Sequence, residues 1–154
     1  MDNPNLSFET SIFIAAPRSR VWQAVTEPNQ LEQWFVPGSP WEIPSLEVGA
    51  PVNFYFAGTD KQEAVIEVVD ALSQFRLRWS EHESHPETIM VTTFTLADEN
   101  EGTRITIHEA AFKALPDGLN HEQVKHEDNG TLIMTANLKA FIEGTPLPYP
   151  ATGA

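Results

Sequence analysis

The sequence predicts an α+β domain in which a curved antiparallel sheet of about six or seven strands wraps around a long C-terminal helix. Between residues 41 and 112, apolar and polar residues alternate in short runs separated by Pro, Gly and Asp-Glu-Asn clusters, which is typical of antiparallel strands. From about residue 122 to residue 143, apolar residues recur at intervals of three and four, as on one face of a helix. A sheet with one apolar face must be covered, and this helix is the only long amphipathic element in the sequence.

The chain opens with a strand and two short helices. Residues 7–14 are rich in β-branched and aromatic types and predict the first strand. Pro17 suits the first position of a helix, which we expect to end near Glu27. Pro28 can open a second short helix that reaches Trp34, and the Pro- and Gly-rich segment after it favours a loop.

The sheet and the final helix complete a single domain. The remaining strands are expected at 41–46, 52–57, 63–69, 75–80, 88–96 and 104–112. The final helix should be weakest at Asn129-Gly130, which indicates a kink or a break near Asp128, and should end at Gly144. We therefore expect one domain over residues 1–144, followed by a flexible tail over 145–154 that is rich in proline.

Charge and composition exclude several classes of function. The net charge of -13 makes the average surface repel phosphate backbones and anionic lipids, so we expect neither nucleic-acid nor membrane binding. Cysteine is absent, which rules out disulfides and a thiol nucleophile and fits a reducing compartment. The N-terminal residues do not resemble an export signal, so the cytoplasm is the expected location.

Several short stretches resemble a known superfamily. The first part of the chain resembles the opening of the START-like (SRPBCC) ligand-binding superfamily at Ile14-Ala15-Ala16-Pro17, at Val21-Trp22-Gln23-Ala24-Val25-Thr26, and at Leu31 and Trp34. The later part resembles the branch related to the C-terminal domain of the Hsp90 ATPase activator at Glu109-Ala110-Ala111-Phe112, Leu115-Pro116 and Asn137-Leu138-Lys139-Ala140-Phe141. The resemblance runs in order from about residue 7 to residue 144.

This resemblance implies a helix-grip fold, in which the sheet and the long helix enclose a cavity. Two positions depart from the branch. This chain has Gly130-Thr131 where Gly-Trp is common, and Ala110-Ala111 where a Ser-Gly pair is common. Without the indole of the Gly-Trp pair the pocket should be enlarged or reshaped, so the ligand cannot be transferred from relatives that keep it.

We expect the ligand site in the gap between the sheet and the C-terminal helix. The candidates are mostly aromatic, because pockets for small molecules have largely apolar linings. They are Trp34, Trp41, Phe54, Phe56, Trp79, Phe94, Glu109, Ile133 and Asn137. For each aromatic residue the alternative is simple packing in the core.

Glu109 is the most informative candidate. Strand parity from Ile105 and Ile107 puts it on the apolar face of the last strand, where a carboxylate must be paired or solvated. It could accept a hydrogen bond from a ligand or act as a base. The alternative is that a bulge turns it outward or that it caps a neighbouring loop.

The sequence predicts no metal site, no cofactor and no hydrolytic triad. His82 and His85 lie among glutamates in an expected hairpin loop, His121 and His126 do not share a helical face, and His108 should point outward. Neither a nucleophile elbow nor a Gly-rich phosphate loop occurs.

Three functions remain open at this point. Binding of a small, largely apolar molecule fits an apolar-lined grip without recognisable catalytic machinery. A cavity enzyme, of the cyclase or hydrolase type implied by START-like relatives, would use Glu109 with Asn137 or a histidine as its acid–base pair. A role as a partner of an Hsp90-type chaperone is implied only by the resemblance. A homodimer is compatible with the sequence, which does not specify one.

Overall fold

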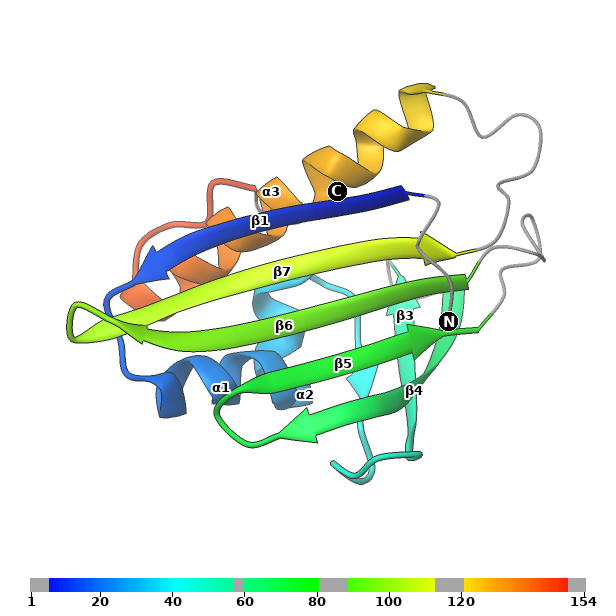
Figure 1. Cartoon of the computed structure of the whole chain (residues 1–154), viewed down its shortest axis with the longest axis horizontal. Helices are drawn as coiled ribbons and strands as arrows, with labels where there is room; N and C mark the ends of the chain where they lie inside the picture. Colours follow the sequence, from blue (N-terminus) through cyan, green and yellow to red (C-terminus); the bar gives the residue numbers. More distant parts are fainter. Residues whose placement is uncertain (1–5, 57–59, 81–88, 113–120, 150–154) are drawn as a thin grey trace.

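The structure is a computed structural model that describes residues 6–56, 60–80, 89–112 and 121–149, with side chains over 8–55, 61–80, 90–110 and 132–149. In this part of the chain, seven antiparallel strands form one sheet in the order β1-β7-β6-β5-β4-β3-β2, with three helices on one side of it (Figure 1). The strands are β1 (Leu6–Ile14), β2 (Trp41–Glu42), β3 (Pro51–Phe56), β4 (Asp60–Asp70), β5 (Gln74–Trp79), β6 (Ile89–Glu99) and β7 (Gly102–Phe112). The helices are α1 (Arg18–Thr26), α2 (Pro28–Trp34) and α3 (His121–Glu143). The predicted α+β helix-grip fold is confirmed.

The helical cover differs from the expected one because α3 does not cover the sheet alone. It packs on β1 and β7, whereas α1 lies against β6 and β7 and α2 lies against β2 and α3. All three helices therefore bury the inner face of the sheet, whose side chains form one core with Val21, Leu31 and Leu138 from the helices. The sequence predicted that the last helix covers the sheet, whereas α1 and α2 form part of this helical layer.

Element boundaries differ from the expected ones mainly at β2. The predicted strand over residues 41–46 shrinks to two residues, Trp41 and Glu42. Pro44 has no N–H to donate to a sheet ladder, which accounts for the early end of the strand. The weak point at Asn129-Gly130 does not interrupt α3, which is continuous from His121 to Glu143.

The hairpin between β6 and β7 fixes the register of the longest strands. Asn100 and Glu101 both have positive φ, 45° and 65°, as a two-residue hairpin turn of the mirror-image type requires. A Cβ atom at Gly102 would lie 2.5 Å from the carbonyl oxygen of Ile14 and 2.7 Å from the Phe13 ring, so only glycine fits there. The ladder then runs without a shift to Ile89 opposite Phe112.

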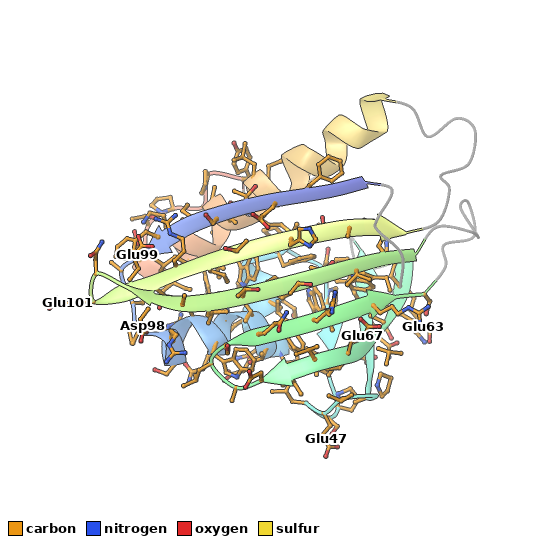
Figure 2. All side chains as sticks on the ribbon, in the orientation of Figure 1. Glu47, Glu63, Glu67, Asp98, Glu99 and Glu101 are labelled. Carbon is orange, nitrogen blue, oxygen red and sulfur yellow. The ribbon has the colours of Figure 1, made fainter. Side chains whose placement is uncertain are left out.

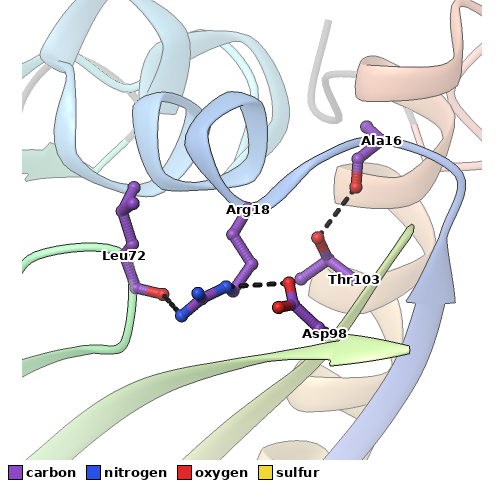
Figure 3. Close-up of polar contacts among 5 residues, drawn as sticks. All are labelled: Ala16, Arg18, Leu72, Asp98 and Thr103. Carbon is purple, nitrogen blue, oxygen red and sulfur yellow. Dashed lines mark hydrogen bonds and ion pairs between the residues drawn. The ribbon is translucent and has the colours of Figure 1, made fainter. Parts of the chain in front are cut away.

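Polar contacts fasten the start of α1 to two turns of the sheet (Figure 3). The Arg18 guanidinium donates from Nε to Asp98 Oδ1 at 2.9 Å and from Nη1 to the carbonyl oxygen of Leu72 at 3.1 Å. The hydroxyl of Thr103 donates to the carbonyl oxygen of Ala16 at 2.8 Å. These contacts hold α1 at the end of the sheet that carries the β4–β5 and β6–β7 turns.

The C-terminal end of α3 is fastened to the end of β1. Glu143 Oε2 accepts a hydrogen bond of 2.9 Å from the backbone N–H of Ala15 and one of 2.8 Å from Lys139 Nζ. These two donors, the backbone N–H first, hold the pKa of Glu143 below its ordinary value. Lys139 also donates to the carbonyl oxygen of Phe13 at 2.7 Å, so the helix is held at a defined position across the edge strand.

Candidate functional site

Four aromatic rings gather where β2, β3 and β5 meet the end of α2. Trp41 and Phe54 face each other in register, with ring centroids 4.7 Å apart. Phe35 lies 5.0 Å from Trp41 and 5.6 Å from Phe54, and Trp79 lies 6.0 Å and 6.1 Å from the same two rings. We call Phe35, Trp41, Phe54 and Trp79 the aromatic cluster. Its rings meet mostly edge to face, the geometry that aromatic pairs prefer.

The sequence identified three members of the aromatic cluster and missed Phe35. α2 ends at Trp34, and Phe35 already has an extended backbone, with φ −89° and ψ 102°. The neighbouring side chains therefore point in different directions, so Phe35 reaches Trp41 while Trp34 turns towards Phe94 at 6.4 Å. The signal available in the sequence was the Trp-Phe pair at the end of a short helix, where the direction of each ring depends on which residue is the last helical one.

Trp34 and Phe94 belong to the packed core. Trp34 is fully buried, and its Nε1 donates to the carbonyl oxygen of Ala24 at 2.8 Å. Phe94 is also fully buried and stacks on Phe75 at 6.1 Å. Both positions are explained by packing, so contact with a ligand stays a prediction for them.

A line of polar side chains runs across the inner face next to the aromatic cluster. Trp79 Nε1 donates to Thr92 Oγ1 at 3.0 Å, and the Thr92 hydroxyl lies 3.0 Å from Glu109 Oε2. Because a hydroxyl has only one proton, Thr92 accepts from the indole and donates to the carboxylate. We call Trp79, Thr92 and Glu109 the polar line. Thr92 is 1% exposed, whereas Trp79 and Glu109 are only partly buried.

The polar line settles on which face Glu109 lies. Thr92 and Glu109 are directly opposite each other on β6 and β7, and their side chains are bonded on the side that carries Ile107 and Phe94. The predicted inner-face position of Glu109 is confirmed, and no bulge turns it outward. Its role towards a ligand stays a prediction.

The indole N–H of Trp41 differs from those of Trp34 and Trp79. It is 4% exposed, and its Nε1 has no hydrogen-bond partner in the described part of the chain. The Nε1 groups of Trp34 and Trp79 both have acceptors, Ala24 O and Thr92 Oγ1. The aromatic cluster thus contains one buried donor that has no acceptor among the described residues.

Asn137 lies on α3 and is 1% exposed, but its amide is already bonded to the backbone. Nδ2 donates to the carbonyl oxygens of Trp34 at 3.2 Å and Tyr149 at 2.7 Å, and Oδ1 accepts from the N–H of Tyr149 at 3.0 Å. Asn137 therefore joins the end of α2 and residues after α3 to the helix. The flexibility expected for 145–154 stays a prediction, although residues up to Tyr149 make these specific contacts.

The other predicted site residues are less informative. Ile133 is partly buried and lies one turn before Asn137 on α3. Phe56 lies outside the described side chains, as do His82, His85, His121 and His126. Within the described residues no group of three or more His, Cys, Asp or Glu side chains is placed to hold a metal ion.

Acidic side chains surround the sheet. Glu47 projects from the loop before β3, Glu63 and Glu67 line β4, and Asp98 with Glu101 projects at the β6–β7 hairpin (Figure 2). They place much of the net charge of -13 at the surface and at the ends of the sheet. An anion would meet a repulsive potential on approach to the molecule.

The fold and these residues define a helix-grip protein with an aromatic cluster on the inner face of its sheet. The sequence model of the family described as "Activator of Hsp90 ATPase homolog 1-like protein" matches residues 15–143, and the chain belongs to this family. No curated protein sequence matches the chain. None of the helices within the described residues is long and apolar enough to cross a membrane.

Solved structures of similar fold include protein MLL2253 from Mesorhizobium loti, with a TM-score of 0.75 and 20% identity over 92% of this chain and 99% of that one. DynU16, a protein of the dynemicin biosynthetic locus, has a TM-score of 0.74 and 23% identity over 95% of this chain, which spans about half (51%) of the length of DynU16. The Aha1 dimer from Colwellia psychrerythraea has a TM-score of 0.68 and 18% identity over 90% of this chain and 96% of that one. At these identities the likeness shows the fold.

Proposed function

We propose that this protein binds a small, largely apolar molecule on the inner side of the sheet, next to the aromatic cluster. The observation that carries the proposal is that Trp79 and Glu109 stay partly accessible although they belong to the inner face of the sheet. Side chains on the inner face of a fully packed sheet are normally buried. Trp41, Phe54, Trp79, Glu109 and Ile133 are the proposed contacts, with Trp34, Phe94 and Asn137 shaping the surrounding core.

The chemistry of these side chains suits such a ligand. Aromatic rings offer a large apolar surface with defined geometry, and a few polar groups fix the orientation of a bound molecule. The polar line supplies a carboxylate held in place by Thr92, so a ligand hydroxyl or amine next to Glu109 would meet a preorganised acceptor. The family membership supports the proposal, since the fold encloses a space between sheet and helix in START-like proteins.

A neutral environment-sensitive dye, N-phenyl-1-naphthylamine, tests the proposal because its emission rises in apolar sites and it carries no charge to be repelled. We expect saturable binding of one dye per chain and a rise in the melting temperature that grows with dye concentration, as for any ligand of the native state. Trp79→Leu should weaken dye binding. Trp22→Leu is the matched control, because Trp22 is also partly buried but packs on Phe75, away from the aromatic cluster.

The proposal fails if the dye does not bind saturably, or if the two tryptophan variants weaken binding equally. Equal weakening would indicate general loosening of the domain. A cavity enzyme is a variant of the same proposal in which Glu109 acts as acid or base. Glu109→Gln would then abolish turnover of an identified substrate while leaving its binding measurable.

A second candidate function is that of a chaperone partner, which the family description supports. It predicts that the purified protein changes the ATPase rate of an Hsp90-type chaperone and binds it directly. Unchanged turnover together with no detectable binding would remove this candidate. Assembly as a homodimer is proposed by analogy to the Colwellia psychrerythraea structure and is tested by light scattering. The cytoplasmic location stays a prediction.

A further inference from the structure

The unsatisfied indole of Trp41 carries information about the ligand. An indole N–H is a donor only, so water, protein or ligand must supply an acceptor. Trp41 is 4% exposed and its Nε1 has no partner in the part of the chain that the structure describes. Buried donors without partners are rare in native proteins, and each one needs a physical explanation.

General features of the fold do not explain this unsatisfied donor. The same chain gives acceptors to the Nε1 groups of Trp34, at 2.8 Å, and Trp79, at 3.0 Å. Trp41 is instead packed among the rings of Phe35, Phe54 and Trp79, none of which carries a nitrogen or oxygen acceptor. The donor therefore lies within the aromatic cluster of the proposed site, where an acceptor from outside the chain would satisfy it.

We infer that the ligand is a flat, neutral, conjugated molecule with a carbonyl oxygen that accepts a hydrogen bond from Trp41 Nε1. This inference rests on the proposed function and specifies the ligand class of that site. A flat ring system matches the edge-to-face packing of the aromatic cluster, because it can continue the same packing. A neutral carbonyl satisfies the donor without adding a negative charge to a molecule of net charge -13.

A site built around a hydrogen-bond donor discriminates strongly against ligands that lack the acceptor. Binding of a hydrocarbon would leave the Trp41 N–H desolvated and unpaired, whereas the matching ketone would pair it. The selectivity should therefore appear as a ratio of affinities between two ligands of nearly equal size and shape. It should depend on Trp41 and on no other indole.

The experiment compares two pairs of probes, fluorenone with fluorene and the smaller 1-indanone with indane, by titration of the purified chain. For the pair that fits, we expect the ketone to bind about tenfold more tightly than the hydrocarbon. Trp41→Phe keeps a ring but removes the N–H, so the preference should vanish while the hydrocarbon still binds. Trp22→Phe, outside the aromatic cluster, should retain the preference.

A second measurement avoids dependence on the folding of the variant. In the wild-type protein, the nuclear magnetic resonance signal of the Trp41 indole proton should move to lower field with the ketone and much less with the hydrocarbon. Equal affinities of ketone and hydrocarbon, or equal indole responses, would overturn the inference and leave the proposed function standing. Failure of all four probes to bind would count against the proposed function itself and against the inference with it.

Discussion

Replacement of Thr92 by valine tests the polar line most sharply. Valine has nearly the shape of threonine but lacks the hydroxyl, so the change removes two hydrogen bonds of 3.0 Å each and leaves the packing intact. Trp79 Nε1 loses its acceptor and Glu109 loses a donor. Thr92 itself is 1% exposed, so water cannot take the place of the missing hydroxyl.

The expected loss of stability is about 2 kcal/mol, from one neutral bond of about 1 kcal/mol and one stronger bond to a carboxylate. This value is an upper limit on the loss of stability, because Trp79 and Glu109 are only partly buried and their polar groups can bond to water instead. For a chain of 154 residues, this difference lowers the melting temperature by about 4–8 °C. Urea denaturation with an unchanged m-value would report the same difference in free energy.

Thr93→Val is the matched control for this change. Thr93 is the next residue on β6, lies on the opposite face of the sheet and is 7% exposed. Both substitutions replace a hydroxyl by a methyl group in a strand, so both gain the same strand preference of valine. We expect Thr93→Val to leave stability nearly unchanged. If the two variants denature at the same urea concentration, the polar line contributes nothing and the reasoning is refuted.

Three further changes test other contacts. Glu143→Gln removes a carboxylate whose pKa is lowered chiefly by the N–H of Ala15. The contribution of this carboxylate to folding stability is full above the unfolded pKa near 4.5 and is lost as the pH falls through the lower folded pKa. The difference in free energy of unfolding between wild type and variant, measured by urea denaturation at several pH values, should therefore shrink below pH 4.5, and a constant difference would contradict this. Asn137→Ala frees the backbone of Tyr149 and should speed proteolysis near that residue, which mass spectrometry can follow; an unchanged cleavage rate would mean that the contact does not hold the segment. Trp34→Phe leaves a buried carbonyl without its donor and should lower the free energy of unfolding by about 1–3 kcal/mol, whereas an unchanged urea midpoint would argue against that bond.

The sequence predicted the sheet well because its physical signals are local. Alternation along β7 placed Ile105, Ile107 and Glu109 on one face, and the parity holds because the ladder from Gly102 to Phe112 has no bulge. In β4, where the register shifts between Ile66 and Val68, the same counting would have failed beyond the shift. Parity is reliable only as far as a strand remains regular.

The site was harder to predict because it depends on contacts between distant segments. Trp34 was predicted as a site residue, but its Nε1 donates to the carbonyl oxygen of Ala24 and its ring is buried in the core. After α2 the chain turns so that the ring of Phe35 packs against Trp41 and Phe54. Contact between Asn137 and a ligand stays a prediction, and its amide binds the backbone of Trp34 and of Tyr149, two segments whose proximity cannot be read from sequence spacing.

A crystal structure of the protein with bound N-phenyl-1-naphthylamine would test the central claim most directly, because it would locate a small apolar molecule on the chain. We predict that the dye lies on the inner side of the sheet, in contact with Trp41 and Trp79. Dye bound only on the outer face of the sheet, or an aromatic cluster that closes on itself and excludes the dye at saturating concentration, would contradict the account.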